Sequence, residues 1–136
     1  MRLHVKLAKR MAVVATAAAA LATAGLATAP TASAYDYNGC GWPRVCFYLT
    51  DSDWNNGKPT AAYQDVTSSY QDLGSNSRGA NKIRNTRNDD RVYLRYYDQY
   101  GVTYYTCLKP NQTSNFSSNA TVTGVRIDTN STCPSS

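Results

Sequence analysis

The pattern that most constrains this chain is a period of two in residues 91–110, RVYLRYYDQYGVTYYTCLKP. Val92, Leu94 and Tyr96 fall on one side of an extended strand, while the residues between them fall on the other side. The alternation pauses at Gly101 and then resumes until a cysteine and a proline, which is typical of a β-hairpin. Because an isolated hairpin is marginally stable in water, this hairpin must belong to a larger sheet.

The rest of the chain after residue 34 has no apolar period of 3.6 residues, and polar residues and glycines interrupt it at short intervals. This pattern predicts an all-β domain. Besides the hairpin, strands are expected at residues 45–50, 59–66, 70–73, 83–86 and 121–128, with a turn at 51–57, a polar loop at 111–119 and a bulge at Gly124. The strands divide into two similar halves, which fits two Greek-key motifs packed as a sandwich.

Residues 1–34 have the features of a secretory signal peptide. A basic start is followed by an apolar run over residues 11–29 and by Ala32-Ser33-Ala34, a cleavage site that would leave Tyr35 as the mature N-terminus. A permanent membrane anchor is the alternative, but the run consists mostly of Ala and Thr and ends at Pro30. We therefore expect an extracellular protein with a single domain over residues 35–136.

Removal of the signal peptide changes the net charge of the chain and the side chains available for catalysis. Four of the 14 Lys and Arg residues lie in residues 1–34, which leaves ten against nine acidic residues and a net charge of +1. This balance does not predict binding to nucleic acid or to an anionic membrane. The only histidine, His4, leaves with the signal, and the chain has no Glu. We therefore expect neither an enzyme nor a cofactor, and we expect a monomer.

All four cysteines lie in the exported part, and an even number in a small exported domain predicts two disulfides. Three pairings are possible. We favour Cys40–Cys46, a short local link, together with Cys107–Cys133, which closes the C-terminal half. No Cys-x2-Cys spacing is present, so a zinc site is not expected.

Several motifs resemble the βγ-crystallin-type secreted proteins of actinomycetes, and in particular the Streptomyces metalloproteinase inhibitor family. The resemblance extends over residues 37–128. It rests on the Cys40-x5-Cys46 opening, the aromatic–Gly hairpins, Ile83-Arg84-Asn85, Gly124-Val125-Arg126-Ile127, and Leu94-Arg95-Tyr96 followed by Thr106-Cys107-Leu108-Lys109. It implies a βγ-crystallin-like sandwich.

The resemblance also implies inhibition of an extracellular proteinase of the thermolysin type. Cys107 would be P1 and Leu108 would be P1′, in a loop that continues through Lys109 and that Pro110 stiffens. The family closes its reactive-site cysteine with another a few residues later, whereas here the next cysteine is Cys133. The alternation offers another interpretation, in which Leu108 is simply the last inward residue of its strand.

The abundance of aromatic residues suggests a different function. The chain has 11 Tyr, and exposed rings stack on sugars, so a cell-wall or polysaccharide-binding role is the alternative, as in the killer-toxin-like crystallin proteins that the chain also resembles. The candidate patch consists of Trp42, Tyr93, Tyr97, Tyr100 and Tyr105. Weak calcium binding is a further candidate at Asn88, Asp89 and Asp90, although Asp residues in such a segment more often form turns.

Overall fold

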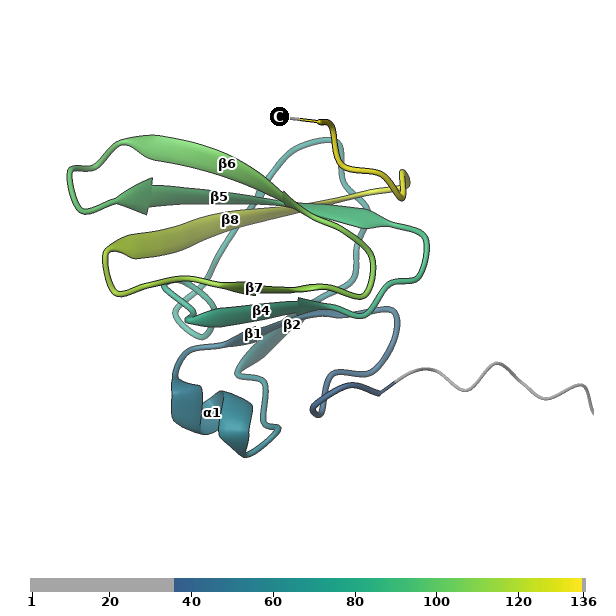
Figure 1. Cartoon of the computed structure of the whole chain (residues 1–136), viewed down its shortest axis with the longest axis horizontal. Helices are drawn as coiled ribbons and strands as arrows, with labels where there is room; N and C mark the ends of the chain where they lie inside the picture. Colours follow the sequence, from purple (N-terminus) through teal and green to yellow (C-terminus); the bar gives the residue numbers. More distant parts are fainter. Residues whose placement is uncertain (1–35, 136) are drawn as a thin grey trace, which may run out of the picture. The chain divides into compact units, whose positions relative to one another are not determined.

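Two four-stranded antiparallel sheets form a β-sandwich in the part of the chain that the structure, a computed structural model, describes: residues 36–135 (Figure 1). The predicted signal over residues 1–34 and Tyr35 lie outside the described residues. The first sheet has the strand order β2-β1-β4-β7, and the second has the order β3-β8-β5-β6. The elements are β1 (Val45–Tyr48), α1 (Asp51–Asn55), β2 (Ala61–Tyr63), β3 (Gln71–Asp72), β4 (Lys82–Asn85), β5 (Arg91–Asp98), β6 (Thr103–Leu108), β7 (Thr113–Asn115) and β8 (Ala120–Asp128).

The two halves of the chain have the same strand order. In the first half, β2, β1 and β4 are neighbours in one sheet, and β3 crosses to the other sheet. In the second half, β6, β5 and β8 are neighbours in the same way, and β7 crosses back to the first sheet. Each sheet therefore contains strands from both halves, which ties the halves together.

The main core lies between the two sheets and follows the predicted alternation. Val92 and Leu94 of β5 are fully buried, and Tyr96 packs at the edge of the same cluster. The other buried members of the cluster are Val45, Phe47, Leu73, Ala80, Ile83, Leu108, Val122, Val125 and Ile127. Each buried Val, Leu, Ile or Phe side chain stabilises the fold by about 1.5–3 kcal/mol.

A smaller cluster covers the outer face of the first sheet, where Cys40, Cys46 and Tyr48 are buried with Trp54 against them. Trp54 lies in α1, a helix of five residues in a region where the sequence pattern predicts a turn. Thr50 caps this helix, because its hydroxyl accepts from the amide of Asp53 while the Asp53 carboxylate accepts from the amide of Thr50. The helix is too short to show an apolar period.

Other local predictions also needed correction. The expected strand at 59–66 is a strand only over Ala61–Tyr63, with an isolated bridge from Val66 to Ile127 of β8. The expected loop at 111–119 contains β7, which pairs with β4. The bulge at Gly124 is confirmed: Arg95 pairs with Gly124 and the next pair is Tyr96 with Val122, so one residue of β8 has no partner in β5.

Both favoured disulfides, Cys40–Cys46 and Cys107–Cys133, are present, and the described residues contain no free cysteine. The second bond joins the end of β6 to the C-terminal segment and so prevents this segment from fraying. Within residues 36–135, no helix is long and apolar enough to cross a membrane.

Candidate functional site

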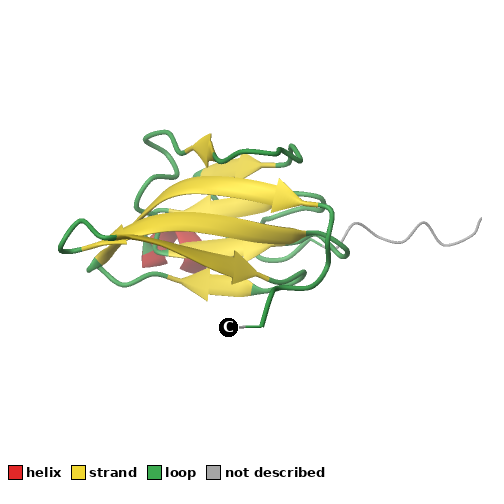
Figure 2. Cartoon of the chain, turned by 90° about the horizontal axis from the view of Figure 1, so that it is seen from above, coloured by secondary structure: helices red, strands yellow, loops and turns green. Residues whose placement is uncertain are grey.

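Among the described residues, no helix covers the outer face of the second sheet (Figure 2). Figure 2 looks onto this sheet, and α1 lies behind it, on the far side of the other sheet. The alternation that sends Val92 and Leu94 inward sends Tyr93 and Arg95 outward. Register places Arg126 of β8 beside Tyr93, and Tyr105 of β6 beside Arg95.

Tyrosine rings and guanidinium groups alternate across this surface. We call it the Tyr–Arg face and define it by Tyr70, Arg91, Tyr93, Arg95, Tyr105 and Arg126. The Arg126 guanidinium lies 4.5 Å from the Tyr93 ring centre and 5.6 Å from that of Tyr70. Arg91 lies 4.9 Å from Tyr93 on the same face. Such cation–π contacts hold both the rings and the guanidinium planes in place.

The two edges of the sheet meet through their tyrosines. Tyr70 precedes β3 and Tyr105 belongs to β6, yet their ring centres are 5.5 Å apart. They reach each other above Arg95 and Gly124, which lie on the two strands between them. A Cβ atom at Gly124 would lie 3.0 Å from the Arg95 guanidinium carbon, so glycine lets this side chain lie flat on the sheet.

Two carboxylates partly balance the charge of the Tyr–Arg face. Asp72 pairs with Arg95, and Asp128 pairs with Arg91 at 3.1 Å. The hydrogen bond from Arg91 is the main reason that the pKa of Asp128 is lowered. Arg126 lies 4.0 Å from the same Asp128 oxygen, which is too far for a hydrogen bond.

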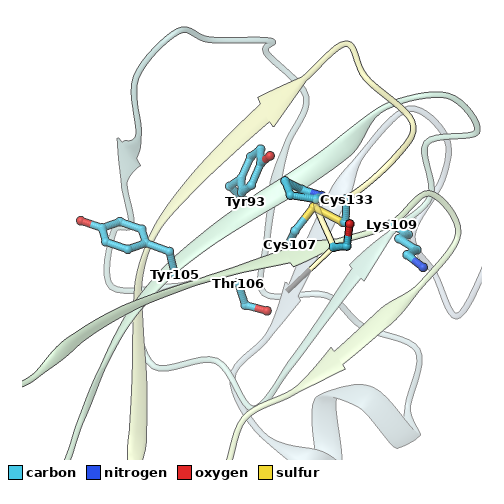
Figure 3. A pocket seen from close by; sticks show the side chains of 8 residues that line it. Tyr93, Tyr105, Thr106, Cys107, Lys109 and Cys133 are labelled. Atoms are coloured by element: carbon cyan, nitrogen blue, oxygen red, sulfur yellow. A yellow bond between two sulfur atoms is a disulfide. The ribbon is translucent and has the colours of Figure 1, made fainter.

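A groove of about 650 Å³ borders the Tyr–Arg face at its β6 side (Figure 3). Tyr93 and Tyr105 line it from the sheet, and the C-terminal segment forms its other wall. The remaining lining residues are Thr106, Cys107, Lys109, Cys133, Pro134 and Ser135. The Tyr105 side chain is 62% exposed, so one ring is accessible both from the groove and from the open face.

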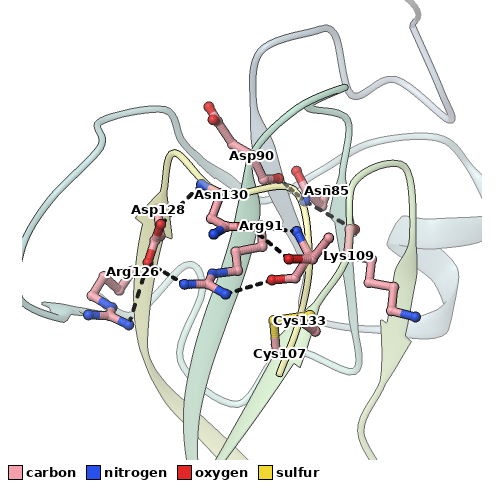
Figure 4. Close-up of a disulfide and its surroundings, with 10 residues drawn as sticks. Asn85, Asp90, Arg91, Cys107, Lys109, Arg126, Asp128, Asn130 and Cys133 are labelled. Atoms are coloured by element: carbon pink, nitrogen blue, oxygen red, sulfur yellow. Dashed lines mark hydrogen bonds and ion pairs between the residues drawn. A yellow bond between two sulfur atoms is a disulfide. The ribbon is translucent and has the colours of Figure 1, made fainter. Parts of the chain in front are cut away.

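The wall formed by the C-terminal segment is fastened by more than the disulfide (Figure 4). The Arg91 backbone amide donates to the Asn130 carbonyl at 2.7 Å, and its guanidinium donates to the Thr132 carbonyl at 2.6 Å. With Cys133 bonded to Cys107, the segment is held at three points. The part of this wall up to Cys133 is therefore fixed, and Pro134 and Ser135 follow the last of these contacts.

The predicted aromatic patch is only partly brought together. Tyr93 and Tyr105 lie on the Tyr–Arg face, and Tyr97 lies further along β5, with Arg78 5.8 Å from its ring. Tyr100 is 81% exposed in the turn between β5 and β6, while Trp42 lies in the loop before β1 of the other sheet. Tyr70 and the three arginines were missed, although the outward positions of the predicted strands pointed to Arg91, Arg95 and Arg126.

The segment suggested as a reactive-site loop begins inside a strand and continues into the turn that follows it. Cys107 and Leu108 belong to β6, where Leu108 pairs with Val92 and is 5% exposed within the core. Lys109 is exposed beyond it, and its carbonyl accepts a hydrogen bond from the side chain of Asn85 at 3.2 Å. The alternation-based interpretation of Leu108 as an inward residue is therefore confirmed.

The suggested calcium residues are already engaged in other contacts. The Asp90 carboxylate is buried and pairs with Arg87, and the Asn88 side-chain oxygen accepts from Asn111 at 3.3 Å. This leaves Asp89 as the one exposed carboxylate of the three suggested residues. The described residues hold no cluster of three or more Cys, Asp, Glu or His side chains suited to a metal ion.

No model of a known protein family matches the chain, and neither does any curated protein or solved structure. The resemblance to the inhibitor family therefore depends on the quoted motifs alone.

Proposed function

We propose that this chain is an exported, βγ-crystallin-like protein that binds an extracellular polysaccharide through the Tyr–Arg face. Two features support the fold assignment: the repeated strand order of the halves and the exchange of β3 and β7 between sheets, as expected for two intertwined Greek keys. Two disulfides fit an oxidising compartment and hence export.

The observation that carries the proposal is the set of three tyrosine rings on one uncovered sheet face. Tyr70 and Tyr105 are in ring contact, and Tyr93 is linked to Tyr70 through the guanidinium of Arg126. Sugar rings present flat C–H surfaces that pack on aromatic rings. Because the tyrosines are already held by their neighbours, binding would cost little side-chain entropy.

The test is depletion of the oxidised protein from solution by insoluble polysaccharides such as chitin, cellulose and bacterial cell-wall preparations. Tyr105→Ala removes the most exposed ring of the face, and we expect it to weaken binding about tenfold, which is about 1.4 kcal/mol. The matched control is Tyr100→Ala, which removes a more exposed ring outside the face. If Tyr100→Ala weakens binding as much as Tyr105→Ala does, the assignment of the site to this face is contradicted.

Proteinase inhibition is the second candidate, and the rigid turn after β6 is the observation that favours it. Lys109 is exposed next to the Cys107–Cys133 bond, and the amide of Asn111 donates to the Arg87 carbonyl at 3.2 Å. A substrate-like segment inhibits when it is rigid in this way. Because Leu108 is in the core, the enzyme would meet the residues that follow it.

Titration of a thermolysin-like metalloproteinase, with subtilisin and trypsin in parallel, tests this second candidate. Inhibition through the turn would be favoured if the protein inactivates the metalloproteinase stoichiometrically, if Lys109→Ala inhibits less, and if Tyr105→Ala inhibits as well as the wild type. Full activity of all three enzymes at micromolar protein would exclude these classes of target.

A further inference from the structure

We infer that the ligand of the Tyr–Arg face is an acidic polysaccharide and that Arg126 binds its anionic groups. This inference rests on the proposed function, since it assumes that the face binds sugar, and it adds the class of sugar polymer. It follows from the charges, hydrogen bonds and ring contacts of the arginines on the face.

The face has one more cation than its carboxylates can neutralise. Arg91 and Arg95 each have a carboxylate at hydrogen-bond distance, on Asp128 and Asp72. Arg126 has only the longer contact of 4.0 Å to Asp128, which is already bonded to Arg91. Among the described residues, Arg126 makes no hydrogen bond to any acceptor, and its Nε atom is a buried donor without a partner.

The environment of Arg126 orients it for anion binding. The rings of Tyr93 and Tyr70 lie within cation–π distance of its guanidinium, at 4.5 and 5.6 Å. The side chain retains 29% of its surface exposed, so it is accessible from solvent. A guanidinium fixed in this way binds carboxylate or phosphate groups in a bidentate manner, with stronger hydrogen bonds than neutral donors make.

A second free cation borders the same surface. Lys109 lines the groove beside Tyr93 and Tyr105, and the other side chains that line the groove include no carboxylate. Arg126 and Lys109 thus lie on either side of aromatic residues that can pack on sugar rings. This pattern matches a polymer in which sugar rings and anionic groups alternate.

The modest charge of the protein argues against nucleic acid as the polymer. Single strands of nucleic acid also stack on aromatic residues, but their binding sites carry many cations along the backbone. Here one guanidinium on the face and one ammonium beside it remain without a carboxylate partner, and residues 35–136 carry a net charge of only +1. An acidic glycan with spaced charges is the better match.

The experiment compares acidic and neutral polymers on the oxidised protein by affinity electrophoresis and calorimetry. The probes are polygalacturonate, which carries carboxylates, a poly(glucosyl phosphate), which carries phosphates between its sugar rings, and a neutral galactan. We expect at least one acidic polymer to bind about tenfold more tightly than the galactan, as for one charge-assisted contact. The preference should shrink between about 0.01 M and 0.15 M salt, as the Debye length falls from about 30 to about 8 Å.

The Arg126→Gln variant tests whether the preference for acidic polymers arises at the Tyr–Arg face. Arg44→Gln is the matched control, because it removes one exposed arginine before β1 of the other sheet. We expect Arg126→Gln to reduce acidic binding about tenfold and galactan binding by a smaller factor, because it also removes the contacts that hold the Tyr93 and Tyr70 rings, while Arg44→Gln changes neither. If both variants weaken acidic binding equally, the attraction is nonspecific and the inference fails.

The affinities of the wild-type protein for the three polymers already test the inference, so the test does not depend on the folding of any variant. Equal affinity for galactan and both acidic polymers overturns the inference but leaves the proposed function standing. Failure to bind any of these three polymers, together with no depletion by chitin, cellulose or cell-wall preparations, overturns both. Displacement of the acidic polymer by an equal concentration of single-stranded oligonucleotide would replace the inference with nucleic-acid binding.

Discussion

Replacing Leu108 with alanine tests whether this residue serves the core or a partner. Its side chain is 5% exposed, belongs to the main core cluster and pairs across the sheet with Val92. Burial of a leucine stabilises a fold by about 1.5–3 kcal/mol, and the cavity left by Leu→Ala raises the usual cost to about 2–5 kcal/mol. Leu108 ends its strand, where the structure can relax, so we expect about 2.5 kcal/mol.

Urea unfolding of the oxidised protein, followed by tryptophan fluorescence, measures this destabilisation. The same change should lower Tm by about 10–20 °C, since each kcal/mol corresponds to about 4–8 °C in a domain of this size. Lys109→Ala is the control, because the adjacent side chain is exposed and its removal should change the free energy of unfolding by less than about 0.5 kcal/mol.

A Leu108→Ala protein that unfolds at the same urea concentration as Lys109→Ala would refute this assignment. Leu108 would then not be a core residue in solution, and a role as P1′ would return as a candidate. If Leu108→Ala is destabilised as expected, any decrease in inhibition by this variant must be compared with its folded fraction before it is attributed to contact with an enzyme.

Two further predictions concern the second disulfide and a buried tyrosine. Replacing Cys107 and Cys133 with alanine opens a link across 26 residues and should cost about 3.5 kcal/mol in urea unfolding; a cost below about 1 kcal/mol would contradict this. Burial raises the pKa of Tyr48 to about 12 from 10.0, so the stability gained by keeping its hydroxyl protonated is complete below pH 10 and is lost as the pH rises to about 12. Between pH 10 and pH 12, the free energy of unfolding of the wild-type protein should therefore fall by roughly 2 kcal/mol more than that of Tyr48→Phe. If the two proteins lose stability in parallel with rising pH, Tyr48 is not buried in solution.

The long strands could be predicted from the sequence because their side chains alternate between core and solvent. Val92 and Leu94 give β5 its register, and this register also fixes which face carries Tyr93 and Arg95. The disulfide between Cys107 and its partner could be favoured because it closes a large loop in the C-terminal half of the domain. The strand alternation and the cysteine pairing could be predicted because each depends on a pattern that extends over many residues.

The short elements could not be predicted in the same way. β7 has three residues, all polar, and it is a strand only because its backbone pairs with β4, which is distant in sequence. The α1 helix is shorter than two turns, so its signal was local, in the capping pair of Thr50 and Asp53. Tyr70 was missed for a related reason: it precedes a strand of two residues, and only the register of β3 with β8 brings its ring over the face.

The composition of the Tyr–Arg face is not required by the fold. Outward positions of β5 and β8 need only residues that tolerate a strand, and threonine or valine would satisfy this need. Instead, the arginines of this face pack against tyrosine rings, and the buried Nε donors of Arg91 and Arg126 have no hydrogen-bond partner among the described residues, as is also true of Arg84 in the other sheet. Departures from local rules of this kind are expected where a surface serves binding.

Replacing Arg126 with glutamine tests whether this arginine is dispensable for folding. The substitution removes the two cation–π interactions with Tyr93 and Tyr70, which at a partly exposed site stabilise a fold by about 0.5–1 kcal/mol. It also removes the buried donor that has no partner, so the two effects oppose each other. Urea unfolding of Arg126→Gln should therefore give a free energy within about 1 kcal/mol of the wild-type value. A larger destabilisation would make Arg126 a structural residue and remove this reason to assign it to a ligand.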